Sequence, residues 1–170
     1  MTTKDFTIKW FAYALALLPV WFLQSFVLNR FPVLGVIPML LPLAGVAVAT
    51  LEGATAGAGF GLAVGVLWDA VTPGAHGAMT LAMALIGLGA GLLAQYALRQ
   101  DLVGCFICSL LALLAIDGGR ILLRLLTRTA PLGAMLRVAG AEILWTLVFV
   151  APVYLLFRWV FRRVPKATVL

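Results

Sequence analysis

Glycine recurs at every fourth position along one apolar stretch of this chain, and the series ends on a carboxylate. The residues are Gly53, Gly57, Gly61, Gly65 and Asp69, within the segment GATAGAGFGLAVGVLWDAV. A spacing of four is about one helical turn, so the glycines form a nearly continuous line along one face. A face without side chains lets a second helix approach closely, which is how helices associate in lipid. We therefore predict a helix-packing seam that ends at Asp69.

The composition places this seam in a membrane. Hydrophobic residues make up 64% of the chain and charged residues 11%, which is far from the composition of soluble domains. At about twenty residues per crossing, the chain has room for about six helices. Since no hydrophilic stretch exceeds a short loop, we expect no attached catalytic or nucleic-acid-binding module. The net charge of +6 is then an orientation signal and a contact with anionic lipid.

We predict an all-α integral membrane protein, in which residues 1–170 form a single polytopic domain. The predicted transmembrane helices cover about 10–28, 33–51, 53–71, 78–98, 102–126 and 138–161. The second of these carries Pro38 and Pro42 and is expected to be kinked or broken, because proline lacks a backbone donor. It meets the glycine-rich helix at Glu52 and Gly53, so the two helices should form a tight hairpin.

The basic residues predict the orientation of this bundle. Six crossings put both termini on one side of the membrane. That side would hold Lys4, Lys9, Arg99, Arg158, Arg162, Arg163 and Lys166, and the other side Arg30, Arg128 and Arg137. The excess favours cytoplasmic N and C termini.

Four charged residues fall inside predicted helices. Asp117, Arg120 and Arg124 lie on one face of the fifth helix, at i, i+3 and i+7, and Glu142 lies near the start of the sixth. Each charge is unfavourable in lipid by about 3 kcal/mol, so each needs a partner. Asp117 can pair with Arg120, and Glu142 can reach Arg137 or Arg124. Two interpretations remain: an ion-pair network that holds these helices in register, or a polar cavity for a ligand or partner helix.

Motifs for catalysis or metal binding are incomplete. The string IDGGR at 116–120 resembles the LDGG element of site-2 intramembrane proteases, but the HExxH motif of that family is missing. The pair Cys105 and Cys108 lies in an apolar segment and is interpreted as small core residues. Asp69 and His76 could together hold a metal, or could cap a helix and order a loop. We predict no catalytic, cofactor-binding or metal-binding residues, and no enzyme.

The block from Gly59 to Gly77 resembles the signature of the rod shape-determining protein MreD family. In that family a glycine-rich helix ends in GxxxGxxxD, here Gly61, Gly65 and Asp69, and a short turn leads to a helix that begins with glycine, here Gly77. Weaker similarities are Pro38 or Pro42, Asp117, Leu144, Trp145, Pro152 and the basic tail. The three charges of the fifth helix depart from the family pattern.

This resemblance implies a non-enzymatic, multi-pass component of the bacterial inner membrane that serves cell elongation. Its implied partners are an MreC-like membrane-anchored protein, the MreB filament, RodA with its class B penicillin-binding protein, and membrane lipid; no nucleic acid is implied. We hypothesise that the glycine groove, or a surface on the first two helices, receives the transmembrane helix of the MreC-like partner. The tail from Arg158 to Lys166 would then touch lipid or filament.

A second hypothesis is the substrate-binding subunit of an energy-coupling-factor vitamin transporter, which is also a small six-helix bundle. On that interpretation Asp117, Arg120 and Glu142 line a vitamin pocket, and the glycine ladder contacts the coupling subunit. The place where polar groups converge distinguishes the two hypotheses.

Overall fold

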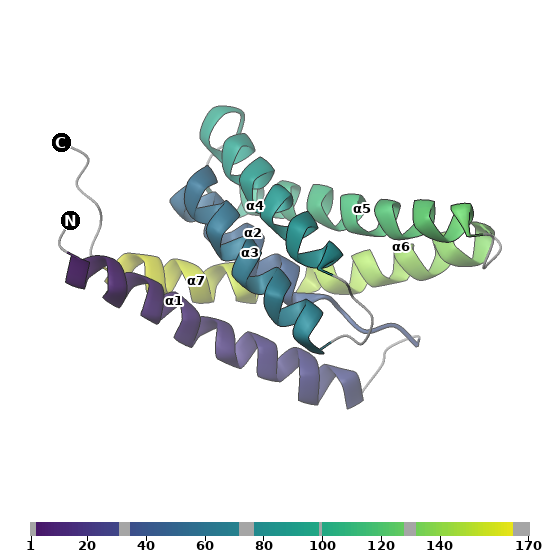
Figure 1. The fold of residues 1–170 in the computed structure, drawn as a ribbon, viewed down its shortest axis with the longest axis horizontal. Helices are drawn as coiled ribbons and strands as arrows, with labels where there is room; N and C mark the ends of the chain where they lie inside the picture. The colour runs from purple at the N-terminus through teal and green to yellow at the C-terminus, as the bar shows by residue number, and fades with distance from the viewer. Residues whose placement is uncertain (1–2, 31–34, 72–76, 99, 128–131, 165–170) are drawn as a thin grey trace.

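The computed structural model describes residues 3–30, 35–71, 77–98, 100–127 and 132–164, which form helices and no β-strand (Figure 1). The elements are α1 (Thr3–Phe22), the π-helical η1 (Leu23–Val27), the 3-10 helix η2 (Leu28–Arg30), α2 (Leu40–Glu52), α3 (Ala54–Val71), α4 (Ala78–Tyr96), α5 (Leu102–Leu126), α6 (Leu132–Val148) and α7 (Val150–Arg163). The predicted all-α class is therefore confirmed.

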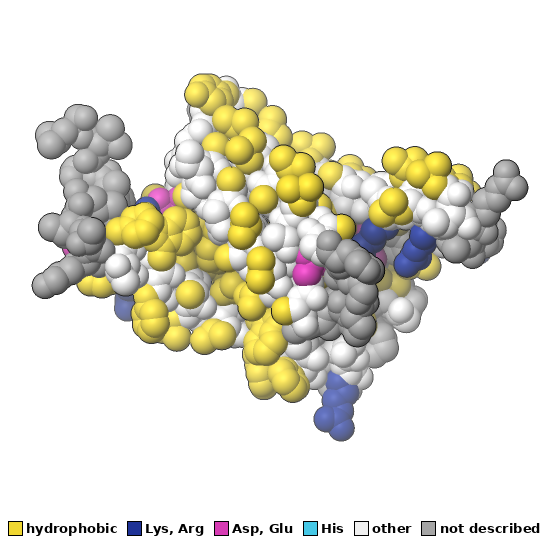
Figure 2. All heavy atoms as spheres, viewed as in Figure 1, with side chains coloured by type: hydrophobic (Ala, Val, Ile, Leu, Met, Phe, Trp, Pro, Cys, Tyr) yellow, Lys and Arg dark blue, Asp and Glu magenta, His cyan; other side chains and the backbone are white. Residues whose placement is uncertain are grey.

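Three helices in the described part of the chain are long and apolar enough to cross a membrane. They are the continuous segment Asp5–Arg30, α4 and α5; α6 and α7 together make a fourth candidate. Large apolar side chains cover much of the visible surface (Figure 2), and Phe11 and Leu81 are 69% and 66% exposed. Such a surface would aggregate in water, but it is the surface that lipid requires.

The short helix α2 forms the core of the bundle. It packs against α1, α3, α4, α5 and α7, and every residue from Leu40 to Leu51 is buried. A helix that is apolar on all faces has no solvent side and is stable only when other helices surround it. α2 is consequently the helix around which the others are arranged.

The prediction for this segment is right about a break and wrong about its position. Helix 33–51 was expected, whereas α2 begins only at Leu40; residues 33–34 lie outside the described ranges. Pro38 precedes the helix because proline disfavours helical geometry in the residue before it. Pro42 is tolerated because it lies in the first turn, where the backbone N–H has no intrahelical acceptor.

Side chains from two other helices cap the buried N-terminus of α2. Gln24 Oε1, on the π-helical turn η1, accepts a hydrogen bond from the Leu41 N–H at 2.8 Å. Thr146 Oγ1, on α6, accepts one from the Met39 N–H at 3.1 Å. These bonds replace the water that would solvate the first N–H groups of an exposed helix.

The predicted helix 138–161 is wrong, because two helices occupy this part of the chain. α6 already begins at Leu132, which places Arg137 in a helix rather than a loop, and α7 follows a break at Phe149 with a bend of 42°. Pro152 is the third residue of α7 and cannot donate to the Val148 carbonyl, so the helix breaks one turn earlier. The Phe149 N–H instead bonds the Thr146 carbonyl at 3.0 Å.

The remaining predicted bounds are closer to the structure. The bounds predicted for the helix at 102–126 are those of α5. The helix predicted at 10–28 begins earlier, at Thr3, and the helix predicted at 78–98 ends earlier, at Tyr96. The predicted 53–71 begins at Ala54, after Gly53 with φ of 97°. In Figure 1, α1 begins and α7 ends at the same end of the molecule, and α5 and α6 project together from the other end.

Thr146→Val tests the cap on α2. Valine has the same shape but no acceptor, so the Met39 N–H would be buried without a partner, and the free energy of unfolding should fall by about 1–3 kcal/mol. Thermal unfolding in detergent measures the effect. Thr127→Val, at the exposed end of α5, is the matched control. Equal stability of the two variants would contradict the capping role of Thr146.

Candidate functional site

The glycine ladder of α3 is in backbone contact with α4 of the same chain. A methyl group added to Gly61 would overlap the Met83 carbonyl oxygen, and one added to Gly65 would overlap the Thr80 Cα. A methyl group on Gly57 would overlap the carbonyl oxygen of Gly87. These close approaches pair the two helices in antiparallel order.

Helix α4 has glycines of its own at the same seam. Side chains on Gly87 and Gly91 would overlap the backbone at Gly57 and Ala54 of α3. The predicted packing seam is therefore present, and its occupant is α4. Because α4 of the same chain fills this groove, a partner's transmembrane helix would have to bind elsewhere, and the other surface that the hypothesis named lies on the first two helices.

Asp69 caps the helix that fills the groove. Its Oδ2 accepts hydrogen bonds from the Thr80 N–H at 2.9 Å and from the Thr80 hydroxyl at 2.5 Å. Thr80 is the third residue of α4, and Gly77, with φ of 75°, begins that helix in a left-handed conformation. A carboxylate at the N-terminus of a helix also interacts favourably with the helix dipole. His76, considered with Asp69 as a metal ligand, lies outside the described residues.

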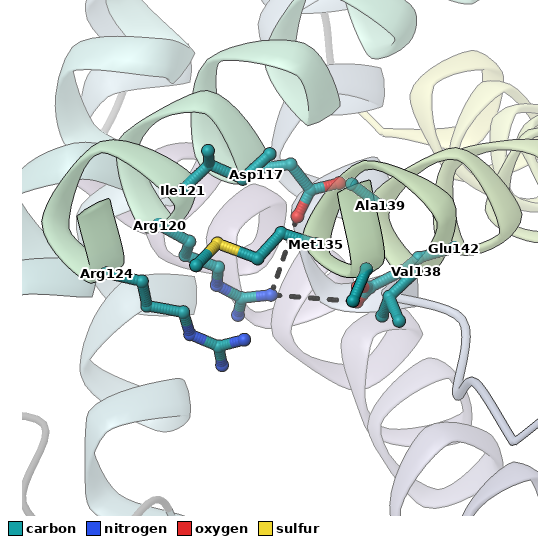
Figure 3. Close-up of a pocket in the computed structure, with 9 residues that line it drawn as sticks. Asp117, Arg120, Ile121, Arg124, Met135, Val138, Ala139 and Glu142 are labelled. Carbon is teal, nitrogen blue, oxygen red and sulfur yellow. Dashed lines mark ion pairs between the residues drawn. The ribbon is translucent and has the colours of Figure 1, made fainter. Parts of the chain in front are cut away.

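Four charged residues of α5 and α6 line one cavity of about 200 Å³ (Figure 3): Asp117, Arg120, Arg124 and Glu142. Arg120 Nη1 lies 3.7 Å from Asp117 Oδ1 and 3.6 Å from Glu142 Oε1, so one guanidinium group bridges two carboxylates on two helices. The same guanidinium lies 5.8 Å from the ring centre of Trp68 on α3. Arg124 lines the cavity one turn further along α5.

This arrangement contains both features between which the sequence left a choice: an ion-pair network and a polar cavity. The cation paired with Glu142 at 3.6 Å is Arg120, which was not expected. Of the two expected partners, Arg124 interacts electrostatically with Glu142 and lines the same cavity, whereas Arg137 is not among the lining residues.

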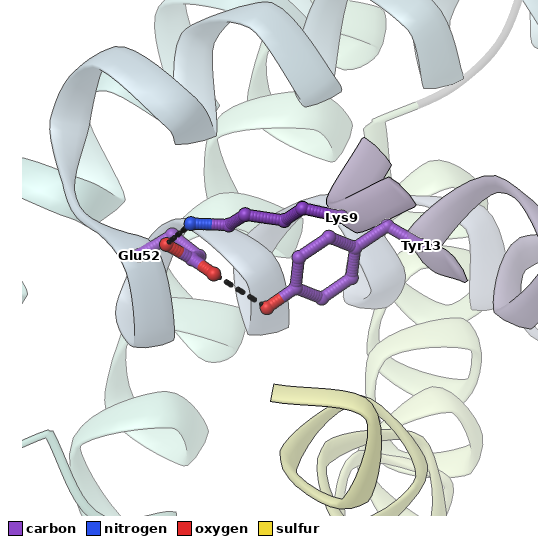
Figure 4. Close-up of polar contacts among 3 residues, drawn as sticks. All are labelled: Lys9, Tyr13 and Glu52. Carbon is purple, nitrogen blue, oxygen red and sulfur yellow. Dashed lines mark hydrogen bonds and ion pairs between the residues drawn. The ribbon is translucent and has the colours of Figure 1, made fainter. Parts of the chain in front are cut away.

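A second polar cluster, which the sequence analysis missed, joins α1 to α2. Glu52 accepts an ion pair from the Lys9 ammonium and, through Oε1, a hydrogen bond of 2.7 Å from the Tyr13 hydroxyl (Figure 4). Glu52 lies 43 positions from Lys9 and 39 from Tyr13 along the chain, so only the presence of a charge at the end of a helix could have pointed to the pairing. The cluster fixes α1 against α2 in surroundings where apolar contacts are weakly selective.

An apolar groove runs between α1 and α3. It has a volume of about 610 Å³ and is lined by Trp10, Ala14, Leu17, Leu18 and Trp21 of α1 and by Phe60, Ala63, Val66 and Leu67 of α3. Trp10 and Phe60 stack in its wall with ring centres 6.3 Å apart. Ala14 and Ala63 are exposed, so a small-residue strip remains open on each helix.

Cys105 and Cys108 are both buried in α5, as expected of small core residues, and both are free thiols. Gly53 separates α2 from α3, where its positive φ allows the abrupt change of direction that makes the predicted hairpin.

Comparison with known proteins gives no match to this chain among family models, curated proteins or solved structures. The functional argument therefore starts from the sequence motif and the geometry above.

Gly61→Ala and Gly59→Ala test the seam as a matched pair. A methyl group on Gly61 meets the α4 backbone, whereas one on Gly59 has open space. We expect Gly61→Ala to lower the free energy of unfolding by about 1–3 kcal/mol through overpacking. Gly59→Ala should raise it by up to about 1 kcal/mol, because alanine favours helices. Thermal unfolding in detergent gives both values, and effects of the same sign would contradict the assigned seam.

Proposed function

We propose that this chain is a non-enzymatic inner-membrane component of the bacterial cell-elongation machinery, which acts by helix–helix contact with an MreC-like partner. The observation that carries the proposal is the Gly59–Gly77 motif. In the structure Gly61, Gly65 and Asp69 of that motif all contact the first part of α4. These three motif residues therefore act together as one structural unit, as expected of a fold-defining signature.

The helical, apolar make-up of the described residues supports a scaffolding role. Among the described residues all elements are helical, and the large apolar side chains are exposed where lipid would contact them. A protein of this kind has only two surfaces for partners: the faces of its helices within the membrane and the ends of its helices outside it.

Six crossings with cytoplasmic termini complete the proposal. α2, with 13 residues, is about 20 Å long, which is shorter than the hydrocarbon core of about 30 Å. The non-helical residues 35–39 that precede it add about 16 Å when extended, so the segment as a whole is long enough to cross. α6 and α7 would form one bent crossing.

The groove between α1 and α3 is the proposed site for the partner's transmembrane helix, since α4 occupies the glycine groove. Its aromatic walls offer a large contact area, and Ala14 and Ala63 permit close approach of a second helix. The last turn of α7 carries Arg162 and Arg163, and this basic end would contact anionic lipid or the MreB filament.

Groove-filling variants test the proposed partner site. Ala14→Phe and Ala63→Phe add bulk to exposed positions, so the fold should remain intact while recovery of the MreC-like protein falls at least about tenfold, equivalent to about 1.4 kcal/mol. Ala151→Phe, at an exposed position of α7 outside the groove, is the control. A tagged chain is purified in mild detergent from its native host and the proteins recovered with it are identified by mass spectrometry.

The proposal is supported if an MreC-like protein and wall synthases are recovered with the wild type and with the control, and if the MreC-like protein is lost only in the two groove variants. Recovery of paired ATPases with a coupling membrane subunit would contradict it and favour the transport subunit instead.

A further inference from the structure

The cavity between α5 and α6 contains a buried carboxylate oxygen without a hydrogen-bond donor. The Asp117 side chain is only 7% exposed, and its Oδ2 has no hydrogen-bond partner among the described residues. An ionised carboxylate can only accept hydrogen bonds, and burying one without donors is unfavourable. The Asp117 side chain lines the cavity, and its Oδ2 is buried in the cavity wall.

Arg120 neutralises the two carboxylates without satisfying their lone pairs. Its distances of 3.7 and 3.6 Å to Asp117 and Glu142 exceed the 2.7–2.9 Å that is usual for hydrogen bonds between ions. The guanidinium group therefore supplies charge balance at long range. Direct hydrogen bonds to the carboxylates remain available to another donor.

The cavity also has a cationic side. Arg120 and Arg124 extend into it from one face of α5, and Figure 3 shows the Arg124 guanidinium beyond Arg120, on the side away from Asp117 and Glu142. Guanidinium groups are well matched to phosphate oxygens in geometry and charge. The cavity thus presents the Asp117 and Glu142 carboxylates at one side and Arg124 at the other, with the Arg120 guanidinium between them.

This separation of charge decides the class of ligand. A purely anionic ligand would meet the carboxylates, and a purely cationic one would meet the guanidinium groups. A zwitterion with a phosphate at one end and a hydrogen-bonding ammonium at the other complements both sides.

We propose that this cavity binds a phosphate–ammonium zwitterion of the phosphoethanolamine type, with its ammonium donating to the Asp117 and Glu142 carboxylates and its phosphate accepting from Arg124. The volume of about 200 Å³ limits the site to a small polar group. Ile121, Met135, Val138 and Ala139 provide apolar walls, and Leu122 and Leu136 beside them are 60% and 54% exposed. These apolar surroundings suit the acyl chains of phosphatidylethanolamine; the free zwitterion has the same polar chemistry.

Lipid selectivity of the purified full chain tests the proposal. The protein is mixed in detergent with equal amounts of phosphatidylethanolamine, phosphatidylcholine and phosphatidylglycerol of identical acyl chains, and retained lipid is counted by native mass spectrometry. We expect phosphatidylethanolamine to be retained about tenfold over phosphatidylcholine, whose quaternary ammonium has no N–H to donate. Phosphatidylglycerol, which has no ammonium, should also be retained less.

Two variants assign the two ends of the ligand. Asp117→Asn should remove the preference for phosphatidylethanolamine over phosphatidylcholine, and Arg124→Gln should lower retention of both. Arg30→Gln, at an exposed position outside the cavity, should change neither. Competition with soluble phosphoethanolamine identifies the source: displacement of the lipid indicates a free zwitterion, and continued retention indicates the lipid headgroup.

Equal retention of the three lipids by the wild type would overturn the proposal, as would an unchanged preference in a folded Asp117→Asn variant. If Asp117→Asn is not recovered as a monodisperse protein, the wild-type selectivity and the loss of retention in Arg124→Gln decide the question, and absence of either overturns the proposal.

Discussion

Direct backbone contact between α3 and α4 is the interaction on which the rest of the bundle depends. In lipid, apolar side chains gain little by leaving their surroundings, so helices associate through close packing and hydrogen bonds. Gly61 and Gly65 on α3, with Gly87 on α4, allow that packing along most of the seam. The seam places Asp69 beside the first turn of α4, where it accepts hydrogen bonds from Thr80. The paired helices also form a surface against which α2 packs, and there Gly45 lies against the end of the Met83 side chain. The seam also leaves no room for a partner's helix, which moves the proposed partner site to α1.

Polar groups inside the bundle supply the selectivity that apolar packing lacks. Each of these polar contacts joins two particular helices: Gln24 and Thr146 attach η1 and α6 to the start of α2, and Glu52 attaches the end of α2 to α1. The short helix α2 is thus fixed at both ends. The network centred on Arg120 has the same effect on α5 and α6, but its long ion-pair distances leave hydrogen-bonding capacity that the other contacts use up. That difference marks the cavity as a place in the bundle where a ligand could bind.

The sequence predicted the local features of this structure better than the pairings between them. The four-residue spacing predicted the seam, and the bounds of α5 followed from its apolar length. The occupant of the seam did not follow, because a glycine face looks the same whether it meets its own chain or a partner; the glycines at 87 and 91 were the available signal. The sequence predicted that Pro38 and Pro42 would disturb a helix, but it did not predict where the helices break. Pro38 and Pro42 shorten α2 and Pro152 divides the last helix, because tertiary contacts decide where a weakened helix breaks. The pairing of Glu142 with Arg120 depended on how α5 and α6 pack against each other, which composition alone does not determine.

Cross-linking in native membranes tests most directly whether α4 fills the glycine groove of its own chain. Cysteines replace Asp69 and Thr80, whose side chains are in contact, in a variant in which Cys105 and Cys108 are alanine. After mild oxidation, we expect a disulfide within one chain: the thiols should become inaccessible to maleimide, and the protein should still run as a monomer. Disulfide-linked dimers, or thiols that remain fully reactive, would show that another helix occupies the groove and would contradict the packing on which the proposed partner site rests.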